Sequence, residues 1–137
     1  MELKDKDYFK DKSKDYEKDK NRVGNVTNIA TKILNEIKYT KDMHIMDFGS
    51  GTGMLLSHIA TQVREITAVD VSKSMIEQLS KKRDSIPCIL NIIEIDLTQK
   101  ELDKKFDGII SSMTIHHIKN IKDIFQKFYE MLETNGT

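Results

Sequence analysis

Short apolar runs alternate with segments of helical periodicity through most of this 137-residue chain. The runs have no helical stripe and end in polar or glycine-rich residues, which is typical of buried parallel strands. They are HIMDF at 44–48, ITAVDV at 66–71, CILNIIEI at 88–95 and FDGIISSM at 106–113. Strands that alternate with helices form βαβ units, so we expect an α/β fold with a parallel sheet that helices cover on both faces.

Apolar residues recur at steps of three and four between these runs, which predicts amphipathic helices. Ser72 or Ser74 is placed to cap one of them, because a serine oxygen accepts hydrogen bonds from the free N–H groups of a helix N-terminus. The segment 98–105 has a weaker pattern and is expected to form a helix or a loop. The expected helices span 26–37, 54–63, 72–85 and 121–132.

The first 24 residues differ in composition from the rest, because Met1–Lys20 mixes lysine with aspartate and glutamate. The charged run is interrupted only by Leu3, Tyr8, Phe9 and Tyr16. Such a leader is typical of a frayed tail or an exposed helix. The alternative is a lid in which one aromatic residue closes over a ligand. We therefore expect a charged leader over 1–24 and a single domain over 25–137.

Charge and cysteine content restrict the partners and the compartment. Lysine and arginine number 22, and so do aspartate and glutamate, so no basic excess indicates a nucleic acid or an anionic membrane as a partner. Cys88 is the single cysteine, which fits a reducing compartment. No apolar run is long enough to span a bilayer and the leader lacks a signal-peptide pattern, so we expect a cytoplasmic protein.

Polar residues follow every predicted strand. They are Asp47–Gly53 after the first strand, Asp70 after the second, Asp96 after the third and Ser111–His117 after the fourth. In an open α/β sheet, ligands bind beyond the carboxyl ends of the strands. Because the carboxyl ends of parallel strands meet at one edge, these residues are expected to form one binding site.

Three glycines within five residues, Gly49, Gly51 and Gly53, connect the first strand to the next helix. Glycine permits positive φ and close approach of the backbone to a ligand, while the helix directs its N–H groups toward it. The dinucleotide fingerprint G-x-G-x-x-G needs a further glycine where this chain has Met54 or Leu56, and a phosphate loop needs a lysine after the last glycine. The loop therefore favours a nucleoside ligand without a pyrophosphate over the NAD of an oxidoreductase.

Several of these segments resemble motifs of class I S-adenosylmethionine-dependent methyltransferases. The segment MDFGSGTG at 46–53 resembles the first motif, and AVDVS at 68–72 resembles the second. The segments IIEIDL at 92–97 and FDGIISSMTIHHI at 106–118 are similar to the third and fourth motifs of the small-molecule branch, and MLETNG at 131–136 is similar to its turn before the fifth strand. The resemblance covers nearly everything after residue 25.

The resemblance implies a Rossmann-like, doubly wound and mostly parallel sheet with the strand order 3-2-1-4. Members of the family have further strands that form much of the acceptor pocket, and this sequence stops before the fifth. We therefore expect a domain that is incomplete at its C-terminus. The exposed fourth strand or the last helix is then expected to recruit a second copy into a homo-oligomer.

The resemblance also implies a role for the acids at the strand ends. Asp47 would orient the glycine loop or meet the amino group of the cofactor. Asp70 would accept hydrogen bonds from the two ribose hydroxyls, for which a carboxylate has suitable oxygens. Asp96 would accept a hydrogen bond from the adenine amine, beside a backbone N–H near Leu97.

The other implied contacts are to the backbone and to apolar or hydroxyl side chains. The backbone of 49–53 would pass beside the methionine moiety and the ribose. Val71 and Met75 would enclose the adenine, and the serines after the fourth strand would border the cofactor. The cofactor-binding residues implied in this way are Asp47, Gly49, Ser50, Gly51, Thr52, Gly53, Asp70, Val71, Met75, Asp96, Leu97, Ser111 and Ser112.

Simpler structural roles are open for some of these residues. Asp47 and Asp96 stand at strand ends, where short acids often cap a helix. The pair His116–His117 offers a base near neutral pH, but adjacent helical residues point in different directions. His116 is therefore the one candidate for the pocket rim, and the catalytic residues are otherwise unassigned. No metal site is expected.

These observations predict an S-adenosylmethionine-dependent methyltransferase that acts on a small molecule by in-line methyl transfer, with S-adenosylhomocysteine as the product. A sulfonium methyl group is already electrophilic, so the protein mainly has to hold the acceptor in line and exclude water. The chain lacks the Asn/Asp-Pro-Pro-Tyr run of enzymes that methylate amino groups of DNA. The alternatives are a non-catalytic S-adenosylmethionine-binding module and a fragment that another chain completes.

Overall fold

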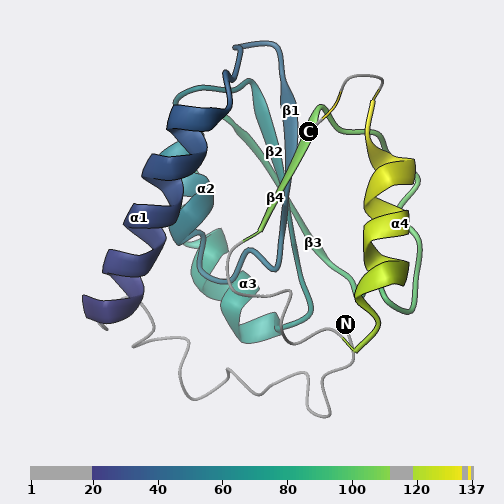
Figure 1. The fold of residues 1–137 in the computed structure, drawn as a ribbon. Helices are drawn as coiled ribbons and strands as arrows, with labels where there is room; N and C mark the ends of the chain where they lie inside the picture. Colours follow the sequence, from purple (N-terminus) through teal and green to yellow (C-terminus); the bar gives the residue numbers. More distant parts are fainter. Residues whose placement is uncertain (1–19, 112–118, 134–135, 137) are drawn as a thin grey trace.

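The sheet has four parallel strands that cross the middle of the molecule (Figure 1). In the computed structural model, which describes residues 20–111, 119–133 and 136, the strands are β1 (His44–Phe48), β2 (Glu65–Asp70), β3 (Ile89–Glu94) and β4 (Gly108–Ser111). Their order is β3-β2-β1-β4, and each neighbouring pair is parallel. The predicted parallel sheet and its order 3-2-1-4 are therefore confirmed.

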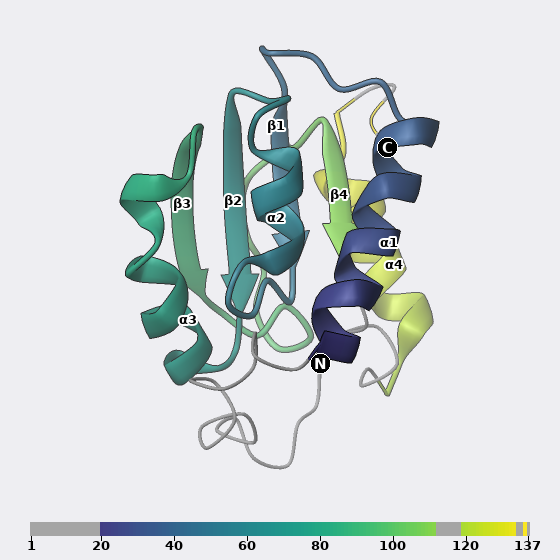
Figure 2. The ribbon, with the colours of Figure 1, turned by 90° about the vertical axis from the view of Figure 1, so that its left-hand side faces the viewer.

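Helices cover both faces of the sheet, as predicted. The helices α1 (Lys20–Glu36), α2 (Met54–Ile59) and α3 (Lys73–Ser80) lie on one face, and α4 (Ile121–Met131) lies on the other (Figure 1). Figure 2 shows the four strands side by side with the first three helices toward the viewer. Within the described ranges, no helix combines the length and the hydropathy that a membrane span requires.

Several element boundaries differ from the expected ones. The helix α1 begins at Lys20, so the expected boundary between leader and domain falls inside a helix. The helix α2 ends at Ile59, and Val63, which fits the helical pattern, packs into the core from the turn that leads into β2. After α3 the chain forms a short 3-10 helix, η2 (Arg83–Ser85). The segment 98–105 forms a turn and a loop and contains no helix.

Alternate residues of the strands supply two hydrophobic cores. Ile45 and Ile66 pack on the side of α1, α2 and α3, whereas Met46 and Phe48 pack on the side of α4. The rings of Phe48 and Phe128 meet edge to face, with their centroids 5.0 Å apart. Full burial of an apolar side chain of this size stabilises a fold by about 1.5–3 kcal/mol. Both faces of the sheet are thus packed against helices, and the sheet supports the loops at its carboxyl edge.

Only part of the apolar face of α4 is buried against the sheet. Ile124 and Phe128 face the core, whereas Ile121, Phe125 and Tyr129 are 43%, 52% and 67% exposed. Among the described residues, β4 forms ladder pairs only with β1. The exposed apolar residues of α4 and the side of β4 away from β1 are the two features through which we predict self-association. Self-association itself stays a prediction.

Candidate functional site

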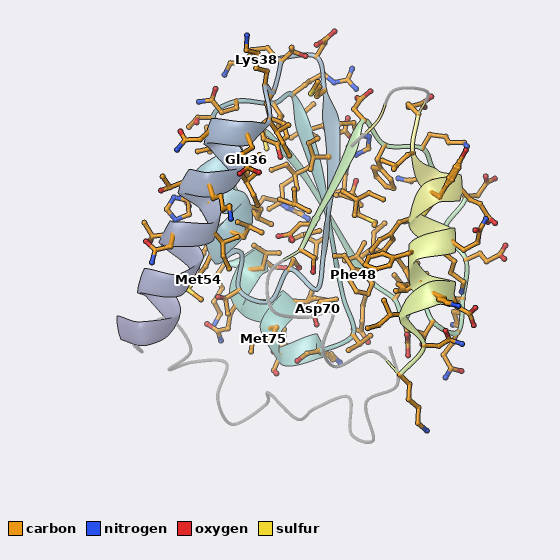
Figure 3. The ribbon with its side chains drawn as sticks, in the orientation of Figure 1. Glu36, Lys38, Phe48, Met54, Asp70 and Met75 are labelled. Atoms are coloured by element: carbon orange, nitrogen blue, oxygen red, sulfur yellow. The ribbon has the colours of Figure 1, made fainter. Side chains whose placement is uncertain are left out.

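The carboxyl ends of the strands meet at one edge of the sheet, as expected. Phe48 at the end of β1, Asp70 at the end of β2 and Met75 in α3 all lie toward this edge (Figure 3). Ser72 caps the N-terminus of α3, where its hydroxyl oxygen accepts from the Met75 N–H at 3.4 Å. The predicted cap is confirmed, and it fixes how the chain leaves Asp70.

The loop after β1 has the backbone conformation that its glycines predict. Gly49, Gly51 and Gly53 have φ angles of 71°, 57° and 87°. The N–H groups of Gly49 and Ser50 both donate to the carbonyl oxygen of Val69, at 2.8 and 3.0 Å. The loop therefore bends from the end of β1 over the end of β2 before α2 begins.

Two glycines of this loop have different surroundings. A Cβ atom added at Gly51 would meet nothing within 4 Å. A Cβ atom added at Gly53 would lie 2.5 Å from the Cδ1 atom of Leu79, which is fully buried. Gly53 is therefore needed for packing against α3, whereas the missing side chain of Gly51 leaves space at the surface of the loop.

Asp70 joins the glycine loop to the end of β2. Its Oδ2 atom accepts from the Gly51 N–H at 2.7 Å, and its Oδ1 atom accepts from the Ser72 N–H at 2.8 Å. The side chain is mostly buried, and this burial raises the pKa of Asp70, although the backbone hydrogen bonds from Ser72 and Gly51 oppose the rise. The carboxylate is thus held in one orientation at the base of the loop.

Polar side-chain atoms of the same loop are buried without a hydrogen-bond partner. In the described part of the chain, these atoms include Asp47 Oδ2, Ser50 Oγ and Thr52 Oγ1. Buried polar atoms usually have partners, so a group of unpartnered ones in one loop marks a place where a ligand or water completes the bonding. Sequence reasoning assigned all three residues to the cofactor site.

Asp47 lies deepest of these residues and is expected to affect stability with pH. Burial, together with the nearby charge of Asp70, raises the pKa of Asp47 well above its model-compound value of 3.8. The folded state therefore binds the proton of Asp47 more tightly than the unfolded state does. The stability that protonated Asp47 contributes is present below about pH 3.8 and is lost as the pH rises through the raised pKa.

We expect Asp47→Asn to melt at a higher temperature than the wild type at pH 7–8, with the difference disappearing toward pH 4, because the amide removes the cost of a buried charge. Thermal unfolding across this pH range measures the effect. Asp84→Asn is the matched control, since Asp84 is exposed in η2. A constant difference between Asp47→Asn and the wild type at every pH would contradict this account.

Asp96 caps a turn after β3. Its Oδ1 atom accepts from the backbone N–H and the hydroxyl of Thr98, at 3.0 and 2.6 Å. Its carbonyl oxygen accepts from the N–H groups of Gln99 and Lys100, at 3.0 and 2.9 Å. Asp96 therefore caps a turn and not a helix, and these hydrogen bonds hold its carboxylate at the edge of the sheet. Leu97, which follows, is 1% exposed.

The remaining predicted site residues vary in their placement. Val71 and Met75 follow Asp70 closely and are buried. The Ser111 hydroxyl donates to the Phe48 carbonyl oxygen at 2.9 Å, so it ties β4 to the end of β1. The predicted contacts of Ser112, His116 and His117 lie outside the described residues.

Sequence reasoning missed two lysines that hold the loops of the site. The Lys82 ammonium donates to the carbonyl oxygen of Thr52 at 3.0 Å, and the Lys127 ammonium donates to the carbonyl oxygen of Leu97. Each lysine lies 30 residues from its partner along the chain. A lysine on a helical pattern is normally read as solvent-exposed, so no signal in one sequence identifies these contacts.

Comparison with known proteins places this site in a family. The family described as "Methyltransferase domain" matches residues 46–137. The matched segment contains the glycine loop, Asp70 and Asp96, which are the residues that meet at the carboxyl edge of the sheet.

Two curated relatives, both named methyltransferases, are similar to this chain in sequence. An uncharacterised methyltransferase of Schizosaccharomyces pombe is 31% identical over 103 residues, which cover 69% of this chain and 36% of the relative. The ubiquinone biosynthesis O-methyltransferase of Rickettsia prowazekii is 26% identical over 108 residues, which cover 79% of this chain and 43% of the relative. The chain therefore spans less than half the length of these relatives.

A solved structure has the same fold. The DhpI protein, solved as a complex named with SAM and HEP, matches with a TM-score of 0.78 and 17% sequence identity, over 94% of this chain and 59% of that chain. At this identity the likeness shows the fold alone, and it agrees with the Rossmann-like sheet described above. Since the family match extends over most of the chain, the protein belongs to the methyltransferase domain family.

Proposed function

We propose that the glycine loop, Asp70 and the turn at Asp96 bind S-adenosylmethionine, and that the protein transfers its methyl group to a small molecule. The observation that carries the proposal is the Asp70 carboxylate, which holds the loop through Gly51 next to the space that the missing side chain of Gly51 leaves. A carboxylate fixed beside an accessible backbone is suited to a ligand that has both a diol and a polar tail.

The groups present fit the chemistry of this cofactor. Both oxygens of the Asp70 carboxylate accept backbone hydrogen bonds, and a carboxylate has about four acceptor sites in all, so ribose hydroxyls would also find acceptors there. The unpartnered atoms of Asp47, Ser50 and Thr52 offer donors and acceptors for the charged methionine end. The buried apolar residues after Asp70 and Asp96 would flank the adenine, with Asp96 accepting from its amine.

When bound, the cofactor supplies a methyl group that its sulfonium makes electrophilic. The residues of this chain then have to bind and orient, because a correctly placed acceptor needs little covalent help. The glycine loop would hold the methionine end, Asp70 would fix the ribose and the turn at Asp96 would fix the base. An acceptor that is already nucleophilic needs no general base, so the proposal assigns none among the described residues.

The relatives support the reaction class and the kind of acceptor. The Rickettsia prowazekii relative is named an O-methyltransferase of ubiquinone biosynthesis, and the structural neighbour is named with SAM in its complex. A neutral net charge also favours a small acceptor over a nucleic acid. We extend to this chain only the class, which is methyl transfer to a small molecule.

Some narrower expectations accompany this proposal as predictions. They are a leader over 1–24 that acts as a tail or a lid, a methyltransferase domain over 25–137, a cytoplasmic location, the absence of membrane and nucleic-acid partners, and a homo-oligomer through β4 or α4. The exposed stripe on α4 supports the last of these, because exposed apolar surface favours association.

Parallel calorimetric titrations with S-adenosylhomocysteine, NAD and ATP test the proposal. We expect S-adenosylhomocysteine to bind, because it has the ribose diol and the methionine end without a pyrophosphate. We expect NAD and ATP not to bind measurably, because the loop lacks the glycine spacing and the lysine that their phosphates require. Binding of NAD in place of S-adenosylhomocysteine would overturn the proposal in favour of an oxidoreductase.

A further inference from the structure

The turn after β3 is held from its far side by a lysine of α4. The ammonium of Lys127 donates to the carbonyl oxygen of Leu97 and, at 3.5 Å, to that of Lys100. The N–H groups of the same turn are bonded to Asp96. Asp96 therefore accepts from the N–H groups of this turn, and Lys127 donates to two of its carbonyl oxygens.

One peptide group connects Lys127 to Asp96. The carbonyl oxygen of Leu97, which accepts from Lys127, belongs to the same peptide group as the Thr98 N–H, which donates to Asp96 Oδ1 at 3.0 Å. A cation at the oxygen and a carboxylate at the N–H polarise this peptide in the same direction, and hydrogen bonds in such chains strengthen one another. The ammonium of α4 thus helps to fix the direction of the Asp96 carboxylate.

Packing alone does not fix this turn against α4. The side chains of Leu97 and Ile124 are buried in the same core, but the surface beside them is hollowed. Two hollows of about 430 and 450 Å³ lie between α4 and the segment 97–105, and Lys127 lines both of them. At the surface, polar contacts of Lys127 bridge the space that side-chain packing leaves.

We propose that Lys127 is a positioning residue for the nucleoside end of the site, which it serves by holding the Leu97–Thr98 peptide and through it the Asp96 carboxylate. This inference rests on the proposed cofactor site. A fixed carboxylate accepts from the amine of adenine and repels the carbonyl oxygen that hypoxanthine has at the same place. Lys127 would therefore control how strongly the site distinguishes these two bases.

The test compares the affinities of S-adenosylhomocysteine and S-inosylhomocysteine by calorimetry. We expect the wild type to prefer the adenine ligand by about tenfold or more, the factor that corresponds to about 1.4 kcal/mol. In Lys127→Met, which keeps the apolar stem and removes the ammonium, we expect this ratio to fall below about threefold. Lys127→Arg keeps a donor and is expected to retain the preference.

The matched control is Lys122→Met on the same helix. Lys122 is exposed, and its side chain forms no hydrogen bond with the described part of the chain, so this variant should retain the wild-type ratio. Circular dichroism without ligand reports the folding of every variant. If Lys127→Met fails to fold, Lys127→Gln takes its place, because its shorter side chain does not reach both carbonyl oxygens.

Each result has one meaning. A reduced ratio in Lys127→Met or Lys127→Gln, with Lys122→Met unchanged, supports the positioning role. A variant that melts earlier but keeps the wild-type ratio overturns it, because Lys127 is then only structural. Failure of the wild type to bind S-adenosylhomocysteine overturns the proposed function, and the inference falls with it.

Discussion

Asp70→Asn is expected to weaken the binding of S-adenosylhomocysteine by about 10- to 100-fold, because a hydrogen bond to a charged group contributes about 1.5–3 kcal/mol. The amide keeps one oxygen and places an NH₂ group where the second oxygen accepts from Gly51 or Ser72. One of these backbone donors then faces another donor. The variant therefore loses both an acceptor for the ribose and the bond that shapes the loop. Titration calorimetry measures the affinity.

The matched control for this variant is again Asp84→Asn, which removes one carboxylate from the exposed surface of η2. Thermal unfolding without ligand separates the loss of stability from the loss of affinity. Burial raises the pKa of Asp70, so the wild-type affinity should also fall in acid as this carboxylate takes up a proton. An affinity of Asp70→Asn equal to that of the wild type would remove Asp70 from the ribose site.

The fold could be predicted from sequence because the strands are short, apolar and buried on both faces. Ile45 and Met46 of β1 face opposite cores, so both faces of this strand carry apolar residues. The strand therefore lacks the alternating polar and apolar pattern of a half-exposed strand and is recognisable as a buried one. Boundaries were harder to predict. The helix α2 ends at Ile59 although Val63 continues the helical pattern. Val63 is buried from the turn that leads into β2, so its apolar character reflects core packing and not helix formation.

The location of the site was predictable for a topological reason, whereas its internal contacts were not. Parallel strands bring Asp70 and Asp96 to the same edge wherever they lie along the chain. The contact of Lys127 with Leu97 depends on how α4 packs against a turn in another part of the sequence. The same holds for Lys82 and the glycine loop. Periodicity reports which face of a helix is apolar, and it contains no information on which carbonyl a lysine reaches.

The glycine loop gives the other large expected effect, which is on stability. Gly53→Ala should reduce the free energy of unfolding by about 2–5 kcal/mol, since a left-handed residue with a Cβ costs about 1–2 kcal/mol and overpacking of a core costs about 1–3 kcal/mol. The first part arises from the φ angle of 87° at Gly53, and the second from the contact of 2.5 Å with Leu79. Urea unfolding measures the sum.

Gly51→Ala separates the two parts because it shares only the first. Gly51 also has a positive φ, of 57°, but its added Cβ meets no atom within 4 Å. This variant should lose about 1–2 kcal/mol of stability. It should nevertheless bind S-adenosylhomocysteine more weakly than the wild type, because its methyl group enters the space beside the proposed site. The difference in stability between the two variants then measures the contact with Leu79.

A double-mutant cycle with Leu79→Ala tests that contact directly. Leu79→Ala alone removes a fully buried side chain and should cost about 2–5 kcal/mol. In that background the methyl group of Gly53→Ala has room, so the second substitution should cost only the left-handed strain, as it does at Gly51. Equal losses for Gly53→Ala with and without Leu79 would show that the leucine moves aside. The glycine would then be required for its backbone conformation alone, and not for the close packing of α3 against the loop.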